Sequence, residues 1–232
     1  MSMDWRRYVA APYGRYRVRN GLDGLHVFGL DNAREALALG PVTFAATHVA
    51  WWDGVLMVVL DDLLGCQSRF VMDDTNLRKF PFFRAIGAIG LDRSSPMAPR
   101  RALLTARKHL SGPNNAVWMF PQGRQRPRHV RPLGLQPGLE FLQRKTRGHV
   151  VPVTLGYGFR ESHKAAAVVT FEPAMTPGFT QSMLEHALLG GIERADGFLD
   201  GQTDGFTTVM GQRTAIVHRG LGSRILARLT RG

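Results

Sequence analysis

One stretch organises this sequence: Thr47-His48-Val49-Ala50-Trp51-Trp52-Asp53-Gly54. The apolar run 42–46 before it predicts a buried strand, and the largely apolar segment 54–64 after it predicts a helix. In one continuous helix, side chains five positions apart would lie about 140° apart around the axis and could not meet. A strand that ends near Thr47 and a helix that begins near Asp53 would bend the chain so that His48 reaches Asp53.

His48 and Asp53 would then form the histidine–aspartate half of a serine-hydrolase triad, with no enzyme nucleophile beside it. The carboxylate would fix the tautomer of the imidazole and leave its second nitrogen as a general base. Such a pair suits an enzyme whose nucleophile is a hydroxyl of the substrate. The alternative interpretation is structural, with His48 capping the helix and Asp53 complementing the helix dipole.

The composition limits the class of protein. A chain of 232 residues suits one domain with a sizeable core, and its formal charge of +12 favours anionic partners. Its single cysteine, Cys66, excludes an internal disulfide framework and favours a reducing compartment. Arginines interrupt the first 20 residues, and the longest apolar run is only 55–60. We therefore expect neither a secretory signal nor a membrane-spanning helix.

Strand and helix patterns alternate along the chain, which predicts a single α/β domain with a mixed central sheet flanked by helices. We divide the chain into a basic, aromatic N-terminal segment (1–24), the main domain (25–195) and a C-terminal extension (196–232). The only segment that suggests flexibility is 197–205. The expected strands are 25–28, 42–47, 69–72, 87–93, 116–120, 150–155 and 165–171, and the expected helices are 32–39, 54–64, 99–110, 136–145 and 182–194.

Two further strand ends carry polar or basic residues, and ligands gather at strand ends in α/β sheets. In the segment 87–93, Arg93 would contact a ligand or form a salt bridge with Asp92. In the turn 120–126, Gly123 permits close approach of the backbone. Four arginines in and after this turn predict a concentrated phosphate-binding surface: Arg124, Arg126, Arg128 and Arg131. The histidines at 109, 129, 149 and 163 show no metal-ligand spacing with one another or with Cys66, so we expect no metal site.

In order along the chain, these segments resemble four motifs of the lysophospholipid acyltransferase family, the glycerolipid acyltransferases of the PlsC type. Residues 48–54 look like the first motif, His-x4-Asp, and residues 87–93 look like the second, Gly-x-x-x-x-Asp-Arg. Residues 120–123 resemble the third, Phe-Pro-Glu-Gly-Thr-Arg, and residues 151–153 resemble the proline-bearing strand of the fourth. The resemblance covers about residues 25–175 and implies an α/β acyltransferase domain at a membrane surface.

The resemblance implies transfer of a fatty acyl chain to a lipid hydroxyl, as in lysophosphatidic acid or a related lysophospholipid. The donor would be an acyl-CoA or acyl-ACP thioester, used as a co-substrate, and no bound cofactor is expected. His48 would be the general base and Asp53 its orienting partner. The residues that would contact the acceptor are Arg93, Gln122, Gly123, Arg124 and Arg126, and those that would support the acyl pocket or the motifs are Trp51, Trp52, Phe120, Pro121, Val151 and Pro152.

The third motif departs from the family, because Gln122 replaces its glutamate and Arg124-Gln125-Arg126 replaces its Thr-Arg. Losing a carboxylate and gaining an arginine changes the local charge by about two units. The dyad is unaffected, but the identity of the acceptor is open. The alternative within the family is a non-phosphate acceptor, such as a glycosylated lipid or a carotenoid.

Two alternatives lie outside acyl transfer. A thioesterase would use water in place of the alcohol. A non-catalytic basic module would bind lipid or nucleic acid through the +12 charge and consume no thioester. Recognised nucleic-acid-binding motifs are absent, so we expect no nucleic acid partner.

A peripheral position is expected, on the inner, cytoplasmic face of the cell membrane. The N-terminal segment mixes aromatic residues with arginines, which suits headgroup depth or a packed arm with a basic face. The segment 216–229 places apolar residues at helical spacing among arginines. It predicts a basic amphipathic helix that lies on anionic lipid or packs onto the domain.

Overall fold

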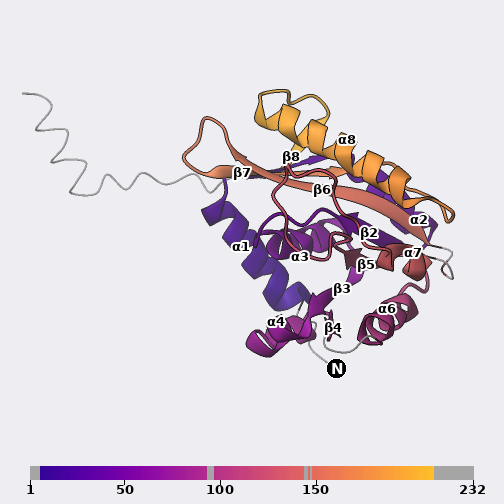
Figure 1. Ribbon diagram of the computed structural model, residues 1–232. Coiled ribbons are helices and arrows are strands. Elements are labelled where there is room, and N and C mark those ends of the chain that lie inside the picture. The colour runs from indigo at the N-terminus through magenta and orange to yellow at the C-terminus, as the bar shows by residue number, and fades with distance from the viewer. Residues whose placement is uncertain (1–5, 93–96, 144–145, 147, 212–232) are drawn as a thin grey trace, which may run out of the picture.

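The computed structural model describes residues 6–92, 97–143, 146 and 148–211, and its central feature is one mixed sheet (Figure 1). Within those residues the strands are β1 (Gly24–Phe28), β2 (Val42–Ala46), β3 (Gln67–Asp73), β4 (Ala88–Leu91), β5 (Asn115–Met119), β6 (His149–Phe159), β7 (Ala165–Phe171) and β8 (Phe206–Gly211). Their spatial order is β4-β3-β5-β2-β6-β7-β1-β8. Parallel ladders join β4 through to β6 and β7 to β1, whereas β6–β7 and β1–β8 are antiparallel. The predicted α/β fold with a mixed sheet is confirmed.

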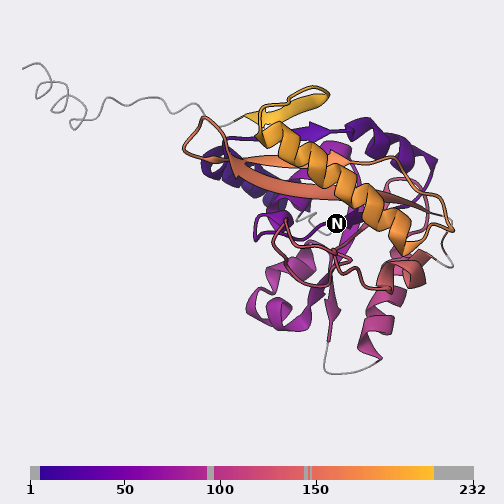
Figure 2. The ribbon, with the colours of Figure 1, turned by 45° about the horizontal axis from the view of Figure 1, so that its top comes forward.

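Helices cover both faces of the sheet (Figures 1 and 2). One face packs against α1 (Ala11–Gly21), α2 (Leu30–Leu39) and α3 (Asp53–Leu64). The other face packs against α6 (Ala98–His109), α7 (Gly138–Gln143) and α8 (Gln181–Leu199). The short helices α4 (Asp74–Lys79) and α5 (Phe82–Ala85) lie beside β3 and β4, and a π-helical turn, η1 (Arg6–Ala10), precedes α1.

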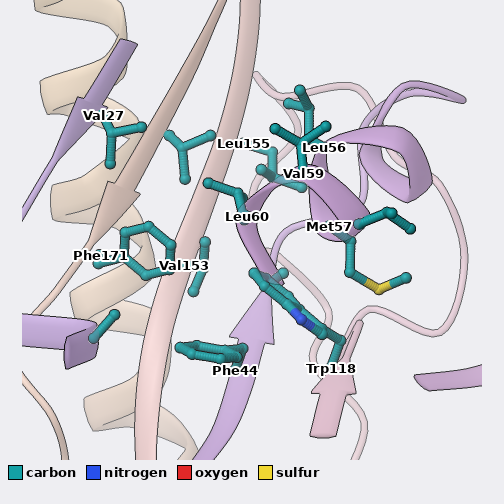
Figure 3. Close-up of a cluster of buried hydrophobic side chains, with 14 of the residues drawn as sticks. Val27, Phe44, Leu56, Met57, Val59, Leu60, Trp118, Val153, Leu155 and Phe171 are labelled. Carbon is teal, nitrogen blue, oxygen red and sulfur yellow. The ribbon is translucent and has the colours of Figure 1, made fainter. Parts of the chain in front are cut away.

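The central strand β2 is buried on both faces, and its sequence is apolar apart from Thr43. Alternate side chains enter opposite cores: Phe44 packs toward α1–α3, and Ala45 packs toward α6–α8. Phe44 lies 4.5 Å from the ring of Trp118 and 5.8 Å from that of Phe171, beneath the apolar face of α3 (Figure 3). Burying a side chain of this size stabilises the fold by about 1.5–3 kcal/mol.

Helix α3 is fixed at both ends. It begins at Asp53, and Gly65 ends it with a left-handed backbone (φ 64°), the conformation that favours glycine after a helix. One buried carboxylate ties its last turns to the sheet, because Asp61 accepts hydrogen bonds from Trp118 Nε1 (2.7 Å) and Ser68 Oγ (2.5 Å). The last turns of α3 are therefore held against β3 and β5, the strands that carry Ser68 and Trp118.

The C-terminal part of the domain extends further than we expected. Helix α8 continues through the boundary placed at residue 195, and β8 adds a strand to the same sheet beside β1. Aromatic packing explains the extension, because Phe198 is buried with its ring 4.6 Å from both His26 and Phe206. The segment 197–205, which suggested flexibility, thus contains the last turn of α8.

The N-terminal segment also joins the domain, since α1 buries Gly14 and Val18 against the first core. Arg93 and the segment 216–229 lie outside the described residues, so the predictions made for them stay predictions. Within the described part of the chain, no helix combines the length and apolar character needed to cross a bilayer.

Candidate active site

The loop between β2 and α3 brings His48 onto Asp53. His48 Nδ1 lies 2.7 Å from Asp53 Oδ2. Because an ionised carboxylate only accepts hydrogen bonds, Nδ1 carries the proton and Nε2 carries the free lone pair. The Asp53 side chain is fully buried, whereas 25% of the His48 side chain is exposed. The bend predicted from the sequence is present, and it leaves one imidazole nitrogen available as a base.

Asp53 accepts hydrogen bonds from four donors. Besides His48, the backbone amides of Val49 (2.7 Å) and Ala50 (3.0 Å) donate to Oδ2, and the hydroxyl of Tyr157 donates to Oδ1 (2.8 Å). Both oxygens are therefore used as acceptors. Since two of the donors are amides of the loop that carries His48, Asp53 fixes the backbone of that loop as well as the imidazole ring.

Tyr157 is the residue of this site that sequence reasoning missed. We expected the strand to end at Leu155, but β6 continues to Phe159. The alternation of Val151, Val153 and Leu155 into the first core continues to Tyr157, which packs against the same core. Burial, followed by the charge of Asp53 and the hydrogen bond to it, raises the pKa of Tyr157 well above its ordinary value. Tyr157 therefore stays protonated at neutral pH and donates a hydrogen bond to Asp53.

Replacing Tyr157 with phenylalanine should weaken the dyad without removing it. We expect the loss of one hydrogen bond to a charged acceptor to lower kcat about fivefold and the free energy of unfolding by about 1–2 kcal/mol. Because the pKa of Tyr157 is raised in the folded state, the stabilisation is fully present below pH 10 and is lost as pH rises further. Denaturant unfolding at pH 7 and above pH 10, with the exposed Tyr16→Phe as control, tests this. An unchanged kcat would separate Tyr157 from the dyad.

A second turn holds His48 from the other side. Gln122 Oε1 accepts a hydrogen bond from the backbone amide of His48 (2.8 Å), and the amide of Arg126 donates to the carbonyl of His48 (2.8 Å). The ring of Phe120 lies 4.4 Å from the imidazole. The turn after β5 thus clamps the backbone of the predicted base, and the buried Gln122 side chain belongs to this clamp.

A large apolar cavity opens beside His48. Its volume is about 1790 Å³, and its lining combines His48 with side chains from α1, α3, β3, α5, α6 and α7. Val55, Val58, Met72 and Phe83 are typical of this lining. The cavity is larger than a usual small-molecule pocket, so it suits an extended apolar ligand.

Five of the other residues selected from the sequence line the same cavity: Trp51, Phe120, Pro121, Gly123 and Arg124. The remaining ones that the structure describes do not. Trp52 packs on Gly21, and Val151 and Pro152 are buried within β6. Gln122 lies in the clamp described above, and the guanidinium of Arg126 packs against Gly134. Gln122 and Arg126 are thus placed to support the turn, and Arg124 is the arginine of this turn that faces the cavity.

The four arginines expected to form one phosphate-binding surface have different surroundings in the structure. Arg128 forms an ion pair with Asp196 (2.7 Å), and Arg131 donates to the carbonyls of Arg128 and Val130. These two guanidinium groups bind oxygen atoms of the protein, and the phosphate-binding surface stays a prediction. Among the described residues, no three His, Cys, Asp or Glu side chains are grouped as metal ligands would be.

Comparisons with known proteins add the family and the fold. Residues 25–156 match the sequence pattern of the family described as Acyltransferase. The chain is similar to the crystal structure of the 1-acyl-sn-glycerophosphate (LPA) acyltransferase PlsC from Thermotoga maritima. That likeness has a TM-score of 0.59 at 18% sequence identity and covers 82% of this chain and 81% of the other. No curated protein matches the chain in sequence.

Proposed function

The chain belongs to the acyltransferase family, and from this premise we propose that it moves a fatty acyl chain from a coenzyme A or acyl-carrier-protein thioester to the hydroxyl of a lipid. His48 acts as the general base and Asp53 as its orienting partner. The observation that carries the proposal is the 2.7 Å contact between His48 Nδ1 and the buried Asp53 carboxylate, at the wall of the apolar cavity. That arrangement supports proton abstraction from an alcohol that arrives with a hydrocarbon chain.

The proton follows one path in this proposal. His48 Nε2 removes it from the acceptor hydroxyl as the oxygen attacks the thioester carbonyl, so the C–O bond forms without an acyl-enzyme. Asp53 stabilises the imidazolium that results. When the tetrahedral intermediate collapses, the C–S bond breaks and His48 returns the proton to the leaving thiolate. The negative charge on the intermediate needs hydrogen-bond donors, for which we propose backbone amides in the turn 121–124.

The acceptor that we propose is a lysophospholipid. Arg124 is exposed and lines the cavity, where a guanidinium can bind a phosphate with two parallel hydrogen bonds. The non-phosphate alternative rested on Gln122, whose side chain is buried and hydrogen-bonded to the His48 amide. This placement makes the Gln122 side chain a weak argument for a neutral acceptor, so the phosphate acceptor is favoured.

Incubation of the purified protein with labelled acyl-CoA and a total lipid extract tests the proposal. We expect the label in a lipid that has gained one acyl chain, followed by selective use of lysophospholipids in a panel that includes glycosylated lipid alcohols. Release of labelled free fatty acid with no labelled lipid would instead indicate a thioesterase. Salt-sensitive binding to nucleic acid with no consumption of thioester would indicate a non-catalytic basic module.

We also propose a peripheral membrane position, which the rim of the cavity supports. Four aromatic residues that line it are also exposed at its opening: Tyr13 (52%), Trp51 (60%), Phe80 (56%) and Phe82 (42%). Arg17 lies over the ring of Trp51, 5.1 Å from its centroid. Aromatic rings beside arginine suit the headgroup region, and the formal charge of +12 favours the anionic cytoplasmic leaflet.

Vesicle flotation should detect this contact. We expect Trp51→Ser with Phe80→Ser to reduce the fraction of protein bound to anionic vesicles about tenfold, because about 1.5–3 kcal/mol of apolar burial is lost for each ring that inserts fully. Phe159→Ser is the matched control, since Phe159 is 72% exposed and does not line the cavity. Equal flotation of all three proteins would show that the aromatic rim does not contact lipid.

A further inference from the structure

A second, smaller hollow lies near one edge of the sheet, between α6 and the neighbouring strands β3 and β4. Its volume is about 740 Å³, within the range of ordinary small-molecule sites. Arg101, Thr105 and Lys108 of α6 line it together with Arg69 of β3. The three α6 positions lie within about 60° of one another around the helix, so they present one face to the hollow.

This hollow, which we call the α6 groove, is positively charged. From Ala98 to His109, α6 contains four arginine or lysine residues and no acidic residue. Two carboxylates also line the groove: Asp74, which pairs with Arg84 at 3.2 Å, and Asp92. Within the part of the chain that the structure describes, no carboxylate forms an ion pair with Arg69, Arg101 or Lys108. Cations gathered without such partners repel one another, so a bound anion would stabilise their arrangement.

The α6 groove and the large cavity are neighbours. Both use α6, with Ala98 and Ala102 on the groove and Pro99 and Leu103 on the cavity. They also use different residues of the same two strands, β3 and β4. Three strand intervals separate β4 from β2, the strand that leads to His48, which corresponds to about 14 Å across the sheet. An extended pantetheine arm can cross that distance.

We propose that the α6 groove binds the phosphorylated nucleotide end of an acyl-CoA donor, its 3′-phosphate and diphosphate, while the acyl chain enters the large cavity. The inference rests on the proposed acyl transfer, because it assigns a binding site to the anionic half of the same acyl-CoA donor. Arginine at two positions suits phosphate oxygens, which a guanidinium binds in bidentate fashion. A hollow of about 740 Å³ is large enough to hold a nucleotide.

A charge-reversed double variant, Arg101→Glu with Lys108→Glu, tests the groove. We expect KM for acyl-CoA to rise at least about tenfold, because two phosphate contacts become repulsive, with little change in kcat at saturation. Turnover of the matching acyl-N-acetylcysteamine thioester, which lacks the nucleotide, should stay within about twofold of wild type. The matched control is Arg100→Glu with Arg107→Glu, on the same helix with the same charge change but outside the groove.

Three results would overturn the inference. The first is an unchanged KM for acyl-CoA in the groove variant, and the second is an equal rise in the control variant. The third is impaired use of acyl-ACP with normal use of acyl-CoA, which would identify a carrier-protein site instead. Failure of the wild-type protein to consume either small thioester would count against the proposed acyl transfer, and is thus distinct from failure of the groove.

A measurement on the wild-type protein does not depend on how the variants fold. 3′-Phosphoadenosine 5′-phosphate should inhibit competitively against acyl-CoA and leave turnover of the acyl-N-acetylcysteamine thioester unaffected. Equal inhibition of both reactions, or inhibition of neither, would contradict a nucleotide site.

Discussion

The variant His48→Ala should lose acyl transfer, with kcat reduced by about three to four orders of magnitude. The alanine cannot take the proton from the acceptor hydroxyl, and the alcohol is a weak nucleophile at neutral pH. KM for the thioester should change little, because the apolar cavity that would hold the acyl chain is lined mainly by other residues. Initial rates with saturating donor and acceptor measure the effect.

The fold should survive this change. With His48 removed, Asp53 keeps three hydrogen-bond donors: the amides of Val49 and Ala50 and the hydroxyl of Tyr157. The buried carboxylate therefore stays satisfied, and we expect a melting temperature within a few degrees of wild type. His163→Ala, an exposed histidine outside the cavity, is the control for histidine loss. Near-normal turnover by a well-folded His48→Ala protein would remove His48 from the mechanism.

The contact between His48 and Asp53 could be predicted because it is local. An apolar run that ends at Ala46 and a helix that begins at Asp53 fix the bend, and five residues are too few to allow many other geometries. The neighbours of this contact could not be predicted in the same way. Gln122 and Tyr157 reach it from positions 74 and 104 residues away along the chain. Their roles depend on which strands are neighbours, and spacing within one segment does not contain that information.

The arginines show a different limit of prediction from the sequence. The turn after β5 is rich in guanidinium groups, but a count of charges does not tell which of them already have partners in the fold. Arg128 binds Asp196 of α8, and the backbone amide of Arg126 binds the carbonyl of His48. Each contact requires a distant segment to fold against the turn. The position of Arg124 on the cavity wall likewise depends on packing that the sequence alone does not reveal.

The C-terminal end of the domain was underestimated for a related reason. Glycines and polar residues around 197–205 predict a loop when they are considered alone. In the structure, Phe198 packs against both Phe206 and His26 of β1, so the segment closes as part of the sheet. Aromatic contacts between distant segments outweigh the local preference of the glycines.

The variant Asp53→Asn should retain the geometry of the site and lose most of its activity, with kcat reduced by about two to four orders of magnitude. The amide oxygen of asparagine can take the place of Oδ2 and accept from His48 and the two loop amides. Its NH2 group would then face Tyr157, whose hydroxyl can accept as well as donate. The hydrogen bonds are kept, but the negative charge that stabilises the imidazolium is lost. We expect the free energy of unfolding to fall by only about 1–3 kcal/mol, because charged hydrogen bonds are replaced by neutral ones.

A double-mutant cycle with Tyr157→Phe then separates the two ways in which Tyr157 can act. If Tyr157 supports catalysis through the Asp53 carboxylate, its replacement lowers kcat in the wild type and has little further effect in the Asp53→Asn background. If Tyr157 contacts a substrate independently, the two losses add. The single hydrogen bond of 2.8 Å between Tyr157 and Asp53 Oδ1 favours the first outcome, since it leaves the hydroxyl directed at the carboxylate. Additive losses of kcat in the double variant would therefore contradict the proposal that Tyr157 acts through Asp53 on His48.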